Sequence, residues 1–293
     1  MVLRTAASLV IAFTAQAAPP DAYRQEIEQW RKGRETRLAA EGGWLSVIGL
    51  DWLAEGVNRF GTDPKNAVVF PEGTGPALAG VLVLAGGKVT LKPEPGAGIT
   101  LDGEAVTERQ LRVDADGKPD VLRLGSLAFH IIKRGERFAV RLKDSQRPER
   151  LAFKGVPAFP VKAAYKVQGT FVPYDPPRSI PIATVIGTSE PMKCPGKVVF
   201  RLGGRKLTLE PVLEPGSEEL FFIFRDRTSG KQTYPAGRFL YAPMAKDGKV
   251  VLDFNKAVNP PCAFTEFATC PLPPRQNALS VPVLAGEKTY GAH

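Results

Sequence analysis

Residues 127–142 read LAFHIIKRGERFAVRL, two short apolar runs on either side of a turn at Gly135. Apolar runs of this length, joined by a few polar residues and a glycine, predict the two antiparallel strands of a β-hairpin. Similar runs, cut by Gly, Pro and Asp-Gly pairs, begin at Trp44 and recur as far as residue 255. We therefore expect a mainly β fold of antiparallel strands.

One helical segment precedes these strands, at residues 21–43. Asp21 is of the residue type that caps a helix N-terminus, and Gly42 with Gly43 ends the helical pattern. The apolar residues of the segment recur at helical spacing and fall close to one face. They are Tyr23, Ile27, Trp30 and Leu38.

The strand pattern breaks over residues 145–162, which lose the alternation of apolar and polar residues. A chain of 293 residues with 43% apolar content is long enough for two domains, so we place a domain boundary in this stretch. We expect an N-terminal helix at residues 18–43, a β-sandwich at 44–148 and an antiparallel β-barrel-like domain at 149–293.

The first seventeen residues, MVLRTAASLVIAFTAQA, combine Arg4, an apolar run and the small-x-small pattern Ala15-Gln16-Ala17. This order is typical of a secretory signal peptide, which we expect to be cleaved after Ala17. The polar sequence that follows argues against a membrane anchor. The sequence thus predicts a periplasmic or secreted protein that does not insert into the membrane after signal removal.

The net charge is +9, but Lys and Arg are spread along the chain and form no run of five or more. This distribution favours a solvated basic surface over a nucleic-acid site, so we expect no nucleic-acid partner. The sequence has no phosphate-binding loop, nucleophile elbow, dinucleotide fingerprint or His-rich metal motif. We accordingly expect no cofactor and no metal site.

Residues 56–143 resemble a forkhead-associated β-sandwich. The strings GVNRFGTDPKNAVVFP, GPALAGVLVLAGGKVTL, LDGEAV and LRLGSLAFHII are similar to its opening strand, central hairpin, turn and closing strand. The phosphothreonine pocket of that fold is not reproduced, because Thr62 stands where an Arg is expected and Asp102 where an Asn is expected. An anionic Asp would repel a phosphate. The resemblance therefore implies a scaffold without phosphopeptide binding.

From Tyr23 to Tyr290 the chain also resembles a bacterial and archaeal family known as domain of unknown function 1684. The strings that carry this resemblance are GWLSVIGLDWL, RLKDSQRP, FRDRTSGKQTYPAGRFLYAP, LDFNKAVNPPCAFTEFATCPLPPRQN and AGEKTY. Cys194 lies in a Lys-Cys-Pro-Gly string where many relatives resemble Ser-Pro-Gly. The resemblance implies a family but no activity.

Residues 253–277 form a Pro-rich stretch without helical or strand period that contains Cys262 and Cys270. Seven residues separate the two cysteines, which suits a disulfide and is too wide for a tight zinc knuckle. Such a bridge would stabilise the loop by roughly 2 to 3 kcal/mol. Two alternatives are a reduced structural pair and a soft-metal site completed by Asp253 or Glu266.

The hairpin at residues 224–241 gathers hydroxyl and guanidinium groups that match an oxyanion. Its candidate ligand-binding residues are Arg225, Thr233, Tyr234 and Arg238. The Asp-x-Thr-Ser-Gly string itself favours an ordinary polar turn, in which Asp226 caps the chain and pairs with an arginine. Around the Cys loop we add further candidates that a barrel mouth would bring together. These are Asp253, Asn255, Asn259 and Glu287.

His130 lies in an apolar strand, where a lone histidine is most often structural. Trp30, Trp44 and Trp52 are interpreted as packing residues, with an apolar ligand groove as the alternative. The preferred function is a binding module for a small polar or anionic ligand in the C-terminal domain. Alternatives are a hydrolase with Asp253 or Glu287 as base, a thiol enzyme of the cell envelope, and a structural envelope interaction protein.

Overall fold

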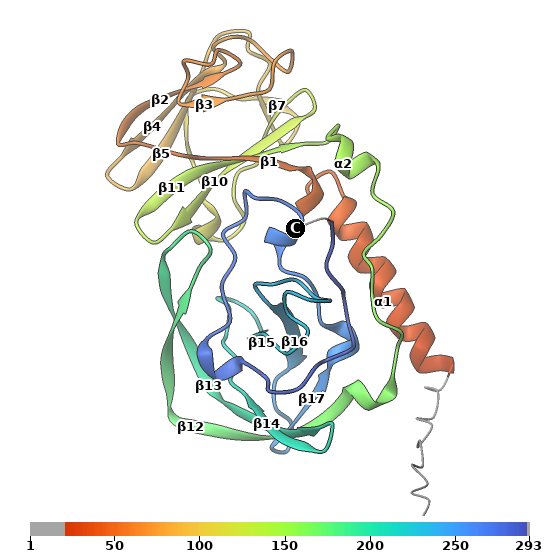
Figure 1. Cartoon of the computed structure of the whole chain (residues 1–293). Helices are drawn as coiled ribbons and strands as arrows, with labels where there is room; N and C mark the ends of the chain where they lie inside the picture. Colours follow the sequence, from red (N-terminus) through yellow and green to blue (C-terminus); the bar gives the residue numbers. More distant parts are fainter. Residues whose placement is uncertain (1–20, 292–293) are drawn as a thin grey trace, which may run out of the picture.

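The computed structural model describes residues 21–291, which form an N-terminal helix followed by four β-sheets (Figure 1). The mainly β prediction with a leading helix is confirmed. The predicted signal peptide, residues 1–17, lies outside the described residues. Among the helices of the described chain, none combines the length and the apolar character that a membrane crossing requires.

Helix α1 spans Asp21–Ala39 and buries Ile27 and Leu38, two of the residues that set its apolar face. It ends because Gly43 folds back on it: a Cβ at this position would lie 2.3 Å from the Leu38 carbonyl oxygen, so only glycine fits. A short 3-10 helix, η1 (Trp44–Ser46), leads from there into the first strand.

The N-terminal half contains two sheets that share one core, and their strand pairs are antiparallel except for β2 and β3. The first has the order β1 (Val47–Trp52), β11 (Arg137–Asp144), β10 (Leu127–Arg134), β9 (Leu122–Leu124), β6 (Thr100–Leu101) and β7 (Glu104–Ala105). The second has the order β3 (Val68–Val69), β2 (Gly56–Gly61), β4 (Gly80–Ala85), β5 (Lys88–Pro93) and β8 (Arg109–Leu111), with β2 and β3 parallel. The 3-10 helix η2 (Asp114–Asp116) lies between β8 and β9.

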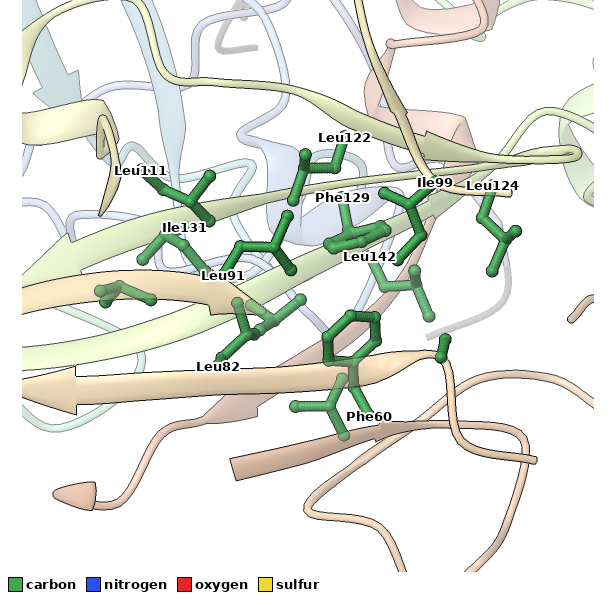
Figure 2. Close-up of a cluster of buried hydrophobic side chains, with 14 of the residues drawn as sticks. Phe60, Leu82, Leu91, Ile99, Leu111, Leu122, Leu124, Phe129, Ile131 and Leu142 are labelled. Carbon is green, nitrogen blue, oxygen red and sulfur yellow. The ribbon is translucent and has the colours of Figure 1, made fainter. Parts of the chain in front are cut away.

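The two sheets pack against each other through a cluster of buried apolar side chains, part of which Figure 2 shows. Phe60 and Phe129 come from opposite sheets, and their rings lie 5.6 Å apart with Phe70 beside both. Burial of each such side chain contributes about 1.5 to 3 kcal/mol. The two sheets therefore form a β-sandwich, and its likeness to a forkhead-associated domain stays a prediction.

The C-terminal half contains a four-stranded and a two-stranded sheet. The first has the order β14 (Arg205–Leu209), β13 (Ser189–Leu202), β12 (Lys166–Ala183) and β17 (Lys249–Asp253), and the second pairs β15 (Glu219–Phe224) with β16 (Arg238–Pro243). The junction before β12 holds α2 (Pro148–Leu151) and η3 (Ala163–Tyr165). A core rich in Phe joins the two sheets: Phe200, Phe222, Phe224 and Phe254 are among its members.

No sheet of the described chain closes into a barrel, so the barrel-like prediction is wrong in this respect. A barrel requires an unbroken ladder of strand pairs. Only isolated bridges, such as Val212 with Phe221 and Phe239 with Val258, continue beyond the β15–β16 pair. The segment that meets these strands, residues 254–290, is rich in proline, which cannot donate the ladder hydrogen bonds.

The irregular segment 254–290 connects the other parts of the molecule. It contains η4 (Phe254–Lys256), η5 (Pro261–Ala263) and η6 (Arg275–Asn277). Asn259 O accepts a hydrogen bond from Arg34 of α1, and Thr265 Oγ1 donates one to the Val47 carbonyl of β1. Pro271 forms a bridge with Thr184 at the tip of the β12–β13 hairpin. This segment thus lies where the helix, the sandwich and the C-terminal sheets meet.

Candidate functional site

A cavity of about 500 Å³ lies where these parts meet. The sandwich strands β10 and β11 contribute Arg134 and Arg141, and the bent β12–β13 hairpin contributes Ile182, Thr184, Glu190 and Met192. Strands β15 and β16 supply an aromatic wall, and the segment 258–271 closes one side. The cavity is therefore made by residues that are far apart in the sequence.

Arg141 is the most unusual residue of this cavity. It is 6% exposed, and within residues 21–291 no group accepts a hydrogen bond from its Nε or Nη2 atoms. Burial lowers the pKa of its guanidinium to about 10, so the group stays positively charged at neutral pH. The Trp44 ring lies 5.0 Å from the guanidinium carbon and compensates part of the charge. A buried cation with unused donors is unfavourable unless an anion meets it.

The two other arginines of the cavity already have carboxylate partners. Arg34 Nε lies 2.8 Å from Glu287 Oε1 and its Nη2 donates to Asn259 O at 2.9 Å. Arg134 Nη1 lies 2.7 Å from Asp114 Oδ2. In the described part of the chain, Arg141 is thus the arginine of this cavity that forms no ion pair with a carboxylate.

Asn259, which also lines this cavity, carries a buried acceptor. Its backbone N–H donates to Glu287 Oε2 at 2.6 Å, and its Nδ2 donates to the Lys288 carbonyl oxygen at 2.7 Å. Because a carbonyl oxygen only accepts, the contact with Lys288 fixes which end of the amide is Nδ2. The other end, Oδ1, is buried and receives no hydrogen bond from any described residue.

The opposite wall is aromatic. The Phe221 ring stacks on Tyr241 with centroids 4.7 Å apart and meets Phe239 edge-on at 4.9 Å. Tyr241 is 40% exposed, which leaves one side of the stack open. Glu190 and Glu214 also line the cavity, and neither forms an ion pair within residues 21–291. Burial raises the pKa of Glu214, which hydrogen-bonds Tyr241.

The hairpin that offers candidate oxyanion ligands forms hydrogen bonds with its own chain. Arg238 is 1% exposed; its Nη2 donates to Asp226 Oδ2 at 2.9 Å, and both Nη atoms donate to backbone carbonyls of residues 283–287. Thr228 Oγ1 donates to Asp226 Oδ1, and the Thr228 and Thr233 hydroxyls lie 2.8 Å apart. These are the contacts of the polar-turn alternative, while Arg225 is exposed on the surface.

Asp253 and Asn255 lie apart from the cavity and attach helix α1. Tyr23 donates its hydroxyl to Asp253 at 2.8 Å, and Asn255 exchanges hydrogen bonds with the backbone of Lys162. Glu287 positions Arg34 and Asn259. Of the ligand-binding candidates predicted from sequence, Asn259 is the one that lines this cavity in the described chain.

Cys262 and Cys270 are adjacent free thiols in the structure, and the Cys262 N–H donates to Cys270 Sγ at 3.2 Å. Cys270 lines the cavity, whereas Cys262 and Tyr234 line a neighbouring depression. The hydrogen bond between the thiols lowers the pKa of Cys262 and, with burial, raises that of Cys270. The disulfide stays a prediction. Residues 21–291 contain no group of three or more His, Cys, Asp or Glu placed to hold a metal ion.

Sequence reasoning did not select Arg141 or Arg34. The signal for Arg141 is a charged residue inside the run FAVRL, where every residue from Phe138 to Leu142 is buried. His130, its cross-strand partner, is also buried, and burial followed by the charges of Lys143 and Arg141 lowers its pKa to about 4. Trp44 was assigned to packing with a ligand groove as the alternative, and it lines the cavity.

Comparisons with known proteins identify a family and similar solved structures. Residues 151–288 match the profile of a family described as "Protein of unknown function (DUF1684)". A search of curated proteins gives no match. The solution NMR structure of an uncharacterized protein from Haloarcula marismortui is 32% identical, with a TM-score of 0.41; the match covers 48% of this chain and 80% of that one.

Proposed function

The chain belongs to the DUF1684 family, whose description gives no activity, and we propose from its cavity that it binds a small organic anion. Arg141 carries this proposal. A buried guanidinium that keeps its charge and has free Nε and Nη2 donors favours a carboxylate or a similar planar anion, which can accept two parallel hydrogen bonds.

The size and the walls of the cavity narrow the class of ligand. A volume of about 500 Å³ falls within the range of pockets that enclose small molecules. Phe221, Phe239 and Tyr241 offer apolar surface opposite the arginine strands, which an inorganic ion would leave unused. A small organic anion with an apolar body suits both features.

We also propose that this binding takes place outside the cytoplasm, in the periplasm or after secretion. The support is the sequence of residues 1–17, with its apolar run and small-x-small end. N-terminal sequencing of the protein recovered from a periplasmic fraction checks this. A chain that begins at Ala18 agrees with the proposal, and an intact Met1 in the cytoplasmic fraction contradicts it.

A thermal-shift titration with 3-phenylpropionate tests the binding proposal, with the uncharged 3-phenylpropanol as the matched ligand. A bound ligand at about 100 times its Kd stabilises the folded state by about 2.7 kcal/mol, so the carboxylate is expected to raise the Tm by several degrees. Arg141→Gln should abolish this rise. Arg201→Gln, which removes an exposed arginine from β13, should leave it intact. An equal rise in wild type and Arg141→Gln would contradict the proposal.

A further inference from the structure

The cavity contains two buried polar groups of opposite hydrogen-bonding sense. Nε and Nη2 of Arg141 are donors without an acceptor, and Asn259 Oδ1 is an acceptor without a donor in the described chain. Both residues are more than nine-tenths buried and both line the cavity. A ligand that satisfies both must carry an anionic acceptor and, in the same molecule, an N–H or O–H donor.

Of the positively charged lining residues in the described chain, two have a carboxylate partner and one has none. Arg34 and Arg134 are neutralised by Glu287 and Asp114, so the positive charge left for a ligand is that of Arg141 alone. One unbalanced cation suits a monoanion better than a dianionic phosphate.

The remaining lining charges are negative. Glu190 and Glu214 have no cationic partner among residues 21–291 and would repel a ligand that is purely anionic. A positively charged group on the ligand turns this repulsion into attraction. The open face of the Phe221–Tyr241 stack is also a favourable surface for a cation or for an apolar side chain.

From this combination we propose that the ligand is zwitterionic, a free α-amino acid with a large apolar side chain. Its carboxylate binds Arg141, and its ammonium group donates to Asn259 Oδ1 in the field of Glu190 and Glu214. Its side chain packs against the aromatic wall with Ile182 and Met192. This inference rests on the proposed function, because it assigns the second charge of a ligand whose first charge binds Arg141.

Isothermal titration calorimetry with three related probes tests this assignment. L-phenylalanine carries both charges, 3-phenylpropionate lacks the ammonium group and 2-phenylethylamine lacks the carboxylate. L-leucine and L-methionine are included as zwitterions with other apolar side chains. At least one of the amino acids is expected to bind about tenfold or more tightly than 3-phenylpropionate, since a charged hydrogen bond is lost without the ammonium group. 2-Phenylethylamine should bind weakest.

Glu190→Gln sharpens the result, with Glu218→Gln as the control because Glu218 is exposed and lies outside the cavity lining. Glu190→Gln should weaken amino-acid binding several-fold and leave 3-phenylpropionate binding equal or stronger. Circular dichroism confirms that each variant is folded.

Three outcomes would contradict the proposal that the ligand is zwitterionic. The first is that 3-phenylpropionate binds as tightly as every amino acid, and the second is that Glu190→Gln weakens the binding of both ligand types equally. In either case the proposal of anion binding at Arg141 stands, and the assignment of an ammonium group to the ligand is wrong. If none of the probes binds to the folded wild-type protein, both proposals fall, and the two buried groups are satisfied by water alone.

Discussion

Two regions of this molecule each bury an arginine, and they differ in what surrounds the guanidinium. In the C-terminal half, Arg238 donates to Asp226 and to carbonyls of the segment 283–287, so only its Nε lacks a partner. In the sandwich, Arg141 is nearly as buried, yet its Nε and Nη2 both lack acceptors and no carboxylate pairs with it. The first arrangement stabilises the fold, whereas the second leaves binding capacity for a ligand.

Strand β11 itself presents two different faces. Val140 and Leu142 face the apolar sandwich core, whereas Arg141 between them points to the opposite face and lines the cavity. Alternation along one strand thus places a sealed core and a candidate site back to back. The fold can tolerate an unbalanced charge on one face because the other face supplies the burial of Phe129, Ile131 and their neighbours.

The largest expected change in the free energy of unfolding comes from removing the carboxylate that pairs with Arg238. Asp226→Ala should leave the Arg238 charge buried without its carboxylate and lower the free energy of unfolding by about 3 to 5 kcal/mol. Urea denaturation measures this, with Glu108→Ala as the control, because the Lys92–Glu108 pair is exposed and contributes about 0 to 1 kcal/mol. A loss below about 1 kcal/mol for Asp226→Ala would mean that Arg238 does not need its partner.

The next effect concerns His130, the cross-strand partner of Arg141. Its pKa is about 4 in the folded protein against 6.5 for an ordinary histidine, so between these pH values the unfolded state binds more protons. Stability should therefore be fully present above pH 6.5 and fall by up to about 3 kcal/mol as the pH drops towards 4. Urea denaturation at intervals between pH 7 and 4 measures the slope.

His130→Gln is the matched variant, since glutamine keeps hydrogen-bonding capacity and does not titrate in this range. The slope difference between wild type and His130→Gln isolates the histidine from the acidic groups. Identical pH profiles for the two proteins would show that His130 charges as readily in the folded as in the unfolded state.

A somewhat smaller effect is expected from the cysteines that border the cavity. Oxidation of Cys262 and Cys270 to a disulfide should raise the free energy of unfolding by roughly 2 to 3 kcal/mol, mainly by restricting the unfolded chain. Intact mass and thiol titration with and without reductant identify the state of the protein. Cys194→Ser removes the third thiol and serves as the control. Three reactive thiols after purification without reductant would contradict the bridge.

The smallest change in stability is expected where the ligand effect is largest. Arg141→Met removes an unpaired cation and keeps a long apolar side chain, so the free energy of unfolding should stay within about 1 kcal/mol of wild type or rise. Ligand binding should be lost in the same variant. A decrease of about 3 kcal/mol or more in the free energy of unfolding would mean that Arg141, like Arg238, stabilises the fold.

The strands and the leading helix could be predicted because their signals are local, as in the two apolar runs around Gly135. The prediction of a barrel was wrong because closure of a sheet depends on which strand edges meet. The Pro-rich segment that meets β15 and β16 cannot extend the ladder of hydrogen bonds between strands. Arg238 resembled a ligand residue because the backbone acceptors of its hydrogen bonds come from positions 45 to 49 residues away, in addition to the nearby Asp226. Arg141 was missed because a single charge in a strand normally faces water.

The most direct test of the difference between the two arginines is to observe their Nε–H groups together by ¹⁵N NMR during a titration with 3-phenylpropionate. The signals are assigned with Arg141→Lys and, for the second, by elimination among the slowly exchanging guanidinium groups. We expect the Arg141 signal to shift and saturate while the Arg238 signal stays in place. An Arg141 signal that does not move at saturating ligand, or an equal shift at Arg238, would contradict a binding site at Arg141.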